Sequence, residues 1–143
     1  MNALTKEIPR VGNLRLVRFA LALGAALNIS AGLLLLLAPL WFFNNVGDFG
    51  TFNRHYAGDA GAFVLALGVG LLLAWPNPAH NRAIIAANAI SGLIHAANHL
   101  YDDFLTGSFS AMHFFGQTVP ILVVALLLVW AYFASQSKGE AIH

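Results

Sequence analysis

Four long apolar segments dominate this sequence and decide what kind of structure it can form. Each is close to the roughly 20 residues that an α-helix needs to cross the ~30 Å hydrocarbon core of a bilayer. Backbone polar groups find no water inside lipid, so segments of this kind form helices. The sequence therefore predicts membrane spans at about residues 16–43, 54–75, 82–102 and 113–134.

The composition supports a membrane protein. The chain is 59% hydrophobic and 9% charged, whereas soluble domains carry about 25% charged residues. A soluble fold could not bury this much apolar surface, so we expect the lipid bilayer to be the main partner. The net charge of +1 argues against a nucleic-acid partner, which requires clustered Lys and Arg. The lack of cysteine excludes disulfides, Cys-ligated zinc and iron–sulfur clusters.

The connections between the segments predict a simple topology. The sequence Trp75–Pro78 contains two prolines, which favours a tight hairpin between the second and third spans. The first apolar stretch is too long for a cleaved signal peptide, so we expect it to be retained. Small residues such as Gly61 and Gly68 favour close packing of helices in lipid. The chain is predicted to be all-α, a single up-down bundle of four transmembrane helices over residues 1–143.

The distribution of Lys and Arg predicts the orientation of this bundle. With four spans, only Arg54 falls on one side of the membrane. The positive-inside rule then places both termini in the cytoplasm. We expect a bacterial inner membrane, with the 1–2 and 3–4 loops facing the periplasm. The residues on the cytoplasmic side would be Lys6, Arg10, Arg15, Arg18, Arg82 and Lys138.

Histidine and aspartate residues recur at the outer ends of the last three spans. His95, His99 and Asp102 follow i, i+4, i+7 spacing, so they share one helix face. Polar groups at this depth must be paired, coordinated or hydrated. Imidazole and carboxylate donors without thiolate suit a divalent ion such as iron, copper, zinc or manganese. The predicted metal ligands are His55, Asp59, His95, His99 and His113, with Asp102 and Gln117 peripheral.

Other interpretations of these residues remain open. His95 and His99 would also serve as polar contacts between helices, bonded to Asp59 and Asn28 without a metal. The acidic pair at 102–103 would then be the solvated end of a helix, and His55 and His113 ordinary interfacial residues. Haem b, held by two histidines from different helices, is the alternative cofactor.

In helix number, size and small-residue packing, the chain resembles the DoxX-like group of small bacterial four-helix membrane proteins. That resemblance implies a quinone-linked or redox function, and it transfers no catalytic residue. The leading hypothesis is a metal-dependent oxidoreductase that acts on a small or lipid-soluble substrate. The alternatives are an accessory subunit of a larger membrane complex and a haem b electron-transfer protein. A homo-oligomer is compatible with each of them.

Overall fold

The computed structural model describes residues 13–47, 50–106 and 109–136, and every regular element in these ranges is a helix. Four helical stretches are long and apolar enough to cross a membrane, which confirms the predicted all-α fold. They are α1 (Leu14–Leu37), α3 (Arg54–Ala74), α4 (Arg82–Leu105) and the continuous run of α5 (Ala111–His113), η1 (Phe114–Thr118) and α6 (Val119–Ala134). Of the residues used above, Lys6, Arg10 and Lys138 lie outside the described ranges.

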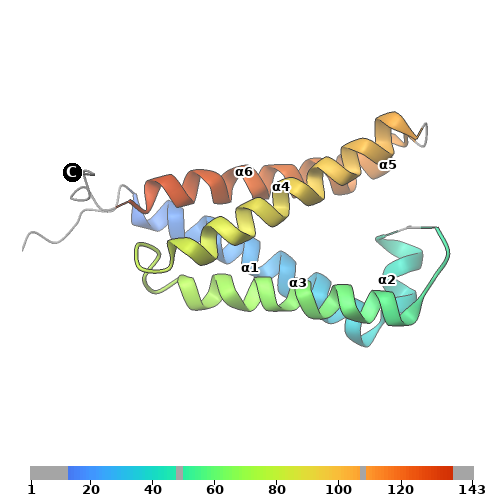
Figure 1. The fold of residues 1–143 in the computed structure, drawn as a ribbon, viewed down its shortest axis with the longest axis horizontal. Helices are drawn as coiled ribbons and strands as arrows, with labels where there is room; N and C mark the ends of the chain where they lie inside the picture. The colour runs from blue at the N-terminus through green and yellow to red at the C-terminus, as the bar shows by residue number, and fades with distance from the viewer. Residues whose placement is uncertain (1–12, 48–49, 107–108, 137–143) are drawn as a thin grey trace, which may run out of the picture.

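The first predicted span is divided at Pro39. Helix α1 ends at Leu37, and Ala38 adopts a non-helical backbone with φ −137° and ψ 52°. A second, short helix, α2 (Pro39–Asn45), begins directly afterwards. Proline lacks an N–H and clashes with the preceding turn, so it can begin a helix but rarely continues one. The last part of the predicted 16–43 segment therefore turns aside as α2 (Figure 1).

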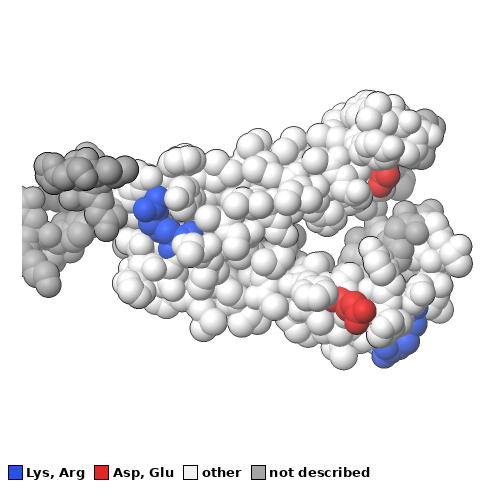
Figure 2. All heavy atoms as spheres, viewed as in Figure 1, with Lys and Arg blue, Asp and Glu red and all other residues white. Residues whose placement is uncertain are grey.

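The spans form two antiparallel pairs, α1 with α3 and α4 with α6 (Figure 1). The pairs meet at the end that carries the Trp75–Asn81 connection, here called the hairpin end. They diverge toward the opposite end, which carries α2 and α5 and is here called the open end. Figure 2 shows a hollow between the pairs at the open end. The start of α1 and the finish of α6 both lie at the hairpin end, as an even number of crossings requires.

Glycines bring the backbones of α1 and α3 into direct contact. A Cβ atom added at Gly32 would lie 2.6 Å from the backbone nitrogen of Leu65. One added at Gly68 would lie 2.8 Å from Cγ1 of Ile29. Lipid gives helices no hydrophobic reason to associate, so close backbone approach is what holds such a pair together. The glycine spacing predicted this mode of packing.

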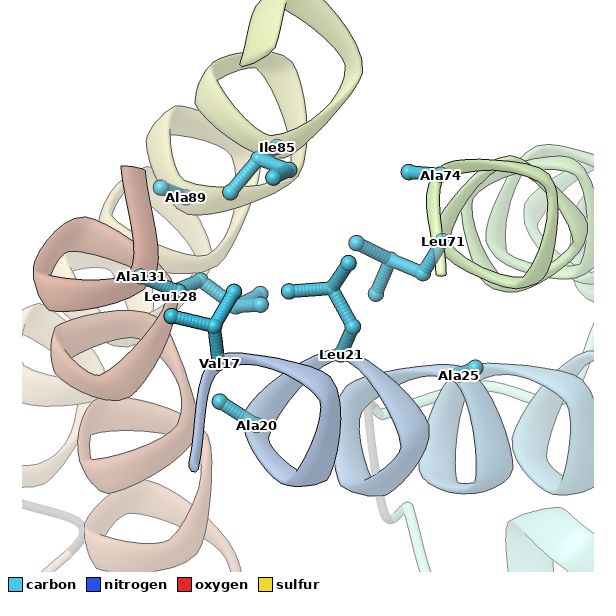
Figure 3. Close-up of a cluster of buried hydrophobic side chains, with 10 residues drawn as sticks. All are labelled: Val17, Ala20, Leu21, Ala25, Leu71, Ala74, Ile85, Ala89, Leu128 and Ala131. Carbon is cyan, nitrogen blue, oxygen red and sulfur yellow. The ribbon is translucent and has the colours of Figure 1, made fainter. Parts of the chain in front are cut away.

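The apolar core lies near the hairpin end, where all four spans meet (Figure 3). Leu21, Leu71, Ile85 and Leu128 each come from a different span and are no more than 2% exposed. Because the core is confined to this end, it joins the two pairs there and leaves them apart at the open end. Its members are Val17, Ala20, Leu21, Ala25, Leu71, Ala74, Ile85, Ala89, Leu128 and Ala131.

Two arginines stabilise the helix ends at the hairpin end. The Arg18 guanidinium donates to the carbonyls of Trp75 and Pro76, at 3.3 and 2.9 Å. Arg82 donates to the carbonyl of Tyr132 at 3.4 Å and lies 4.3 Å from the centre of that ring. A cation at a helix C-terminus complements the exposed carbonyls and the helix dipole. In each antiparallel pair, the first helix thus caps the end of the second.

Candidate functional site

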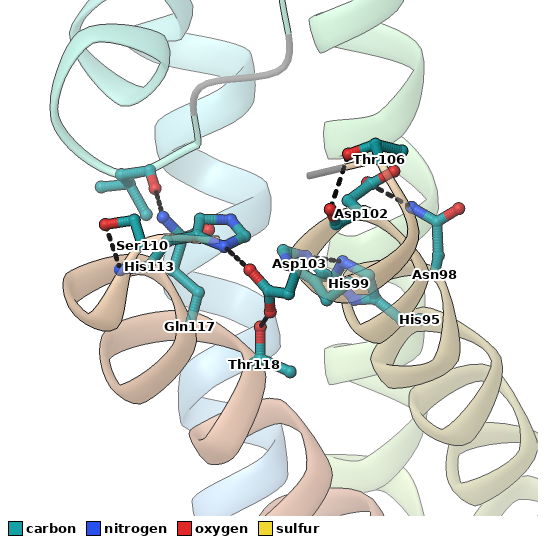
Figure 4. Close-up of polar contacts among 11 residues, drawn as sticks. His95, Asn98, His99, Asp102, Asp103, Thr106, Ser110, His113, Gln117 and Thr118 are labelled. Carbon is teal, nitrogen blue, oxygen red and sulfur yellow. Dashed lines mark hydrogen bonds and ion pairs between the residues drawn. The ribbon is translucent and has the colours of Figure 1, made fainter. Parts of the chain in front are cut away.

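A buried carboxylate links α4 to the start of the fourth span (Figure 4). Asp103 is only 1% exposed. One of its oxygens lies 2.8 Å from Nδ1 of His113, and the other accepts the Thr118 hydroxyl at 2.7 Å. Burying a carboxylate is costly unless its oxygens are hydrogen-bonded, and both are. The interpretation of this acidic pair as a solvated helix end is therefore wrong for Asp103.

A π-helical turn, η1, places both partners of Asp103 on the same side of the fourth span. Residues five apart in an α-helix are about 140° apart around the axis. In the π-helix the bonds run from residue i to i+5, and the N–H of Val119 donates to the carbonyl of Phe114. His113 and Thr118, also five apart, can therefore both reach one carboxylate. Pro120, which has no N–H for an ordinary helical bond, follows directly and favours this irregularity.

Side-chain caps fix where the site-bearing helices begin. The Asn53 side chain accepts from the backbone N–H of Tyr56 at 3.1 Å, which starts α3. The Ser110 hydroxyl accepts from the backbone N–H of His113 at 3.5 Å, which starts α5. Asn and Ser are preferred at this position because they satisfy N–H groups that have no helical partner. His113 is consequently held in the first turn of its span.

The imidazoles of His95, His99 and His113 form a row that ends at Asp103 (Figure 4). The Nε2 atoms of His95 and His99 lie 3.1 Å apart. The ring of His99 stacks on that of His113, with centroids 5.1 Å apart and an interplanar angle of 23°. Among the described residues, Nδ1 of His99 is the only buried side-chain nitrogen or oxygen without a hydrogen-bond partner. The row therefore contains an imidazole whose bonding is incomplete.

His55 and Asp59, also predicted as ligands, stand apart from this row. They pair with each other on α3 at 3.5 Å, and their side chains are 89% and 61% exposed. Within the described part of the chain, no bond or ring contact joins either of them to the imidazole row. The structure thus brings together three of the five predicted ligands, His95, His99 and His113.

The other polar residues named from the sequence have separate partners. Asn28 donates to the side chain of Asn88 at 3.4 Å, so it bridges α1 and α4 without reaching a histidine. The Gln117 side-chain amide donates to the carbonyl of Val46, which ties the fourth span to the loop after α2. Asp102 is exposed and accepts from Asn98 at 3.4 Å. These contacts connect helices and loops around the row without extending it.

In the ranges that the structure describes, no group of three or more His, Cys, Asp or Glu side chains is arranged to hold a metal ion as it stands. His95 and His99 supply two close donors.

Asp103 and Thr118 were not predicted as site residues from the sequence. The sequence spacing could have indicated Asp103, because it follows His99 by four residues and so lies on the same face of α4.

Comparisons with protein-family profiles, with curated proteins and with solved structures gave no match. The resemblance to the DoxX-like group therefore stays a prediction.

Proposed function

We propose that this chain is an integral membrane protein that binds a divalent transition-metal ion at its open end through His95 and His99. The observation that carries the proposal is the 3.1 Å separation of their Nε2 atoms. Two imidazole nitrogens that share one ion at about 2.05 Å lie roughly 2.9–3.4 Å apart for angles between about 90° and 109°. The two nitrogens are within hydrogen-bond distance of each other, and the same separation is compatible with a shared ion.

His113 is the third ligand in this proposal. Its ring stacks on that of His99, so a third imidazole lies beside the pair. Its Nδ1 faces the carboxylate of Asp103, which favours the tautomer with a proton on Nδ1 and a lone pair on Nε2. A carboxylate behind a metal-binding histidine orients the ring and raises its basicity in this way. Asp103 is accordingly a positioning residue.

The same proposal includes an orientation and a location. Three of the four Lys and Arg side chains in the described ranges, Arg15, Arg18 and Arg82, lie at the hairpin end, and Arg54 lies at the other. The positive-inside rule then puts the hairpin end and both termini in the cytoplasm. In a bacterial inner membrane the histidine row would face the periplasm. A redox-active ion there would make the protein an oxidoreductase for a small or lipid-soluble substrate.

The test is to purify the protein in mild detergent without added metal, measure bound elements by mass spectrometry and record the visible spectrum. We expect near-stoichiometric metal in the wild type and a clear loss in His95→Ala and in His99→Ala. His80→Ala and His55→Ala are the controls, since both residues lie outside the row and are exposed. Iron or copper would support redox chemistry, and zinc would exclude it.

Two outcomes would contradict this proposal. A Soret band in the visible spectrum would replace the ion with haem b. Equal metal content in the row variants and in the controls, or no metal at all, would leave the histidines as polar contacts between helices.

A further inference from the structure

The hairpin end carries three arginines that have no acidic partner among the described residues. In that part of the chain, every Asp and Glu lies toward the open end (Figure 2). The terminal segments, 1–12 and 137–143, add three Lys or Arg and two Glu, so they do not neutralise the excess. Uncompensated cations at this level of a membrane attract anionic lipid. The three arginines are Arg15, Arg18 and Arg82.

Arg82 lies at one end of a groove between α4 and α6. Its guanidinium carbon is 4.3 Å from the centre of the ring of Tyr132, a residue that lines the groove. Its Nε donates to the Tyr132 carbonyl at 3.4 Å, and in the described part of the chain its two Nη groups have no hydrogen-bond partner. A guanidinium matches the oxygens of a phosphate with two parallel N–H bonds. Arg82 thus presents donors suited to a phosphate where the groove begins.

The groove is apolar and runs from Arg82 into the span. Its volume is about 260 Å³, below the usual range for pockets that enclose a whole ligand. Arg82 and Leu93 are eleven residues apart on one face of α4, which is a rise of about 16 Å. One leaflet, half of a ~30 Å hydrocarbon core, has about the same thickness. Besides Tyr132, the lining residues are Ala86, Ala89, Ile90 and Leu93 of α4 and Val129 and Phe133 of α6.

We propose that the hairpin end binds an anionic phospholipid, with the phosphate at Arg82 and one acyl chain in the α4–α6 groove. Charge complementarity selects the head group, because a zwitterionic lipid brings its own cation and leaves the arginine excess uncompensated. The groove selects the chain, since it extends one leaflet inward from the level of the phosphate. Arg15 and Arg18 strengthen the attraction through their field at the same end. The proposal shares membrane insertion with the metal site and is otherwise independent of it.

The head group is tested by native mass spectrometry, which counts the lipids that stay bound when the protein is released from nanodiscs. The nanodiscs hold phosphatidylcholine and phosphatidylglycerol with identical acyl chains. We expect the wild type to retain phosphatidylglycerol preferentially. Arg82→Gln should reduce this preference about fivefold, the contribution of one cation at a bilayer surface. Arg54→Gln is the control, because that exposed arginine lies at the open end. No preference in the wild type, or equal losses in the two variants, would overturn the proposal.

Arg82→Lys separates the charge of this residue from its packing. Lysine keeps the positive charge and loses the planar contact with the Tyr132 ring. The preference for phosphatidylglycerol should therefore stay closer to that of the wild type than to that of Arg82→Gln. An equal loss in the two Arg82 variants would mean that the residue acts through Tyr132, and it would overturn the assignment of the phosphate.

The acyl chain is tested at two consecutive alanines of α4. Ala86 lines the α4–α6 groove, and Ala87, about 100° further around the helix, does not. In Ala86→Phe the retained phosphatidylglycerol should fall at least about fourfold, the effect of exposing a single methylene. In Ala87→Phe it should be unchanged. Equal retention in these two variants would overturn the groove as the place of the chain. Lipid retention without bound metal would overturn the metal site alone, and metal without lipid preference would overturn the lipid site alone.

Discussion

The Nδ1 atom of His113 lies 2.8 Å from an oxygen of Asp103, ten residues earlier in the chain and on the neighbouring helix. Asp103 is buried, and its second oxygen is taken by Thr118. This contact fixes the ring orientation of the one histidine in the row that comes from the fourth span. The first prediction follows from it.

Asp103→Asn should weaken metal binding by about 10–100-fold, the usual cost of losing a carboxylate behind a metal-bound histidine. The amide retains an oxygen acceptor, so the fold should persist. Competition with a chelator of known affinity measures the effect. Asp102→Asn is the matched control, because that neighbouring side chain is exposed. If the two variants bind metal equally, Asp103 does not position His113.

Pro120→Ala should allow the π-helical turn to become an α-helical one and move His113 away from Thr118. These two residues are five apart, so in an α-helix they would lie about 140° apart around the axis. We expect the helix content measured by circular dichroism to remain and metal binding to fall. Gly116→Ala is the control, since a Cβ there meets nothing within 4 Å. Unchanged metal affinity in Pro120→Ala would show that the π turn has no role in the site.

Gly32→Ala should destabilise the bundle by about 1–3 kcal/mol, the typical cost of overpacking. The new methyl carbon would lie 2.6 Å from a backbone nitrogen, which cannot move aside as a side chain can. Unfolding in a denaturing detergent measures the change. Gly58→Ala, whose Cβ meets only the Arg54 side chain at 3.8 Å, should be neutral or slightly stabilising. A neutral Gly32→Ala would mean that α1 and α3 are less closely packed in solution.

Arg18→Gln should lower stability by about 1 kcal/mol through loss of its bonds to two backbone carbonyls. The same unfolding assay applies. Arg15→Gln, an exposed residue on the preceding turn, should change stability by less. Similar losses in both variants would point to a general charge effect in place of capping at the end of α3.

Much of the fold could be predicted from the sequence because span length and hydropathy are local properties. The second predicted span, 54–75, matches α3 (Arg54–Ala74) almost residue for residue. The predicted first span runs through Pro39, because the leucine-rich stretch around this residue is apolar enough to cross a membrane. In the structure, the helix ends at Leu37 and a separate helix, α2, begins at Pro39.

The site could be predicted only in part. His95 and His99 were paired correctly because a spacing of four along one helix fixes their proximity. Asp103 looked like a solvated helix end, and only the packing of α4 against α6 buries it. Pro120 favours the π turn between His113 and Thr118, but span length and hydropathy do not encode its hydrogen-bond register. Contacts between helices and irregular turns thus limited the prediction.

The pairing of consecutive spans also bears on how the chain assembles. α1 packs mainly on α3, and α4 mainly on α6, so each partner is the next span to be synthesised. Each pair can form as soon as its second helix has entered the bilayer. Only the docking of the two pairs, through the core at the hairpin end, has to wait for the complete chain. The order of synthesis therefore matches the order in which contacts become available.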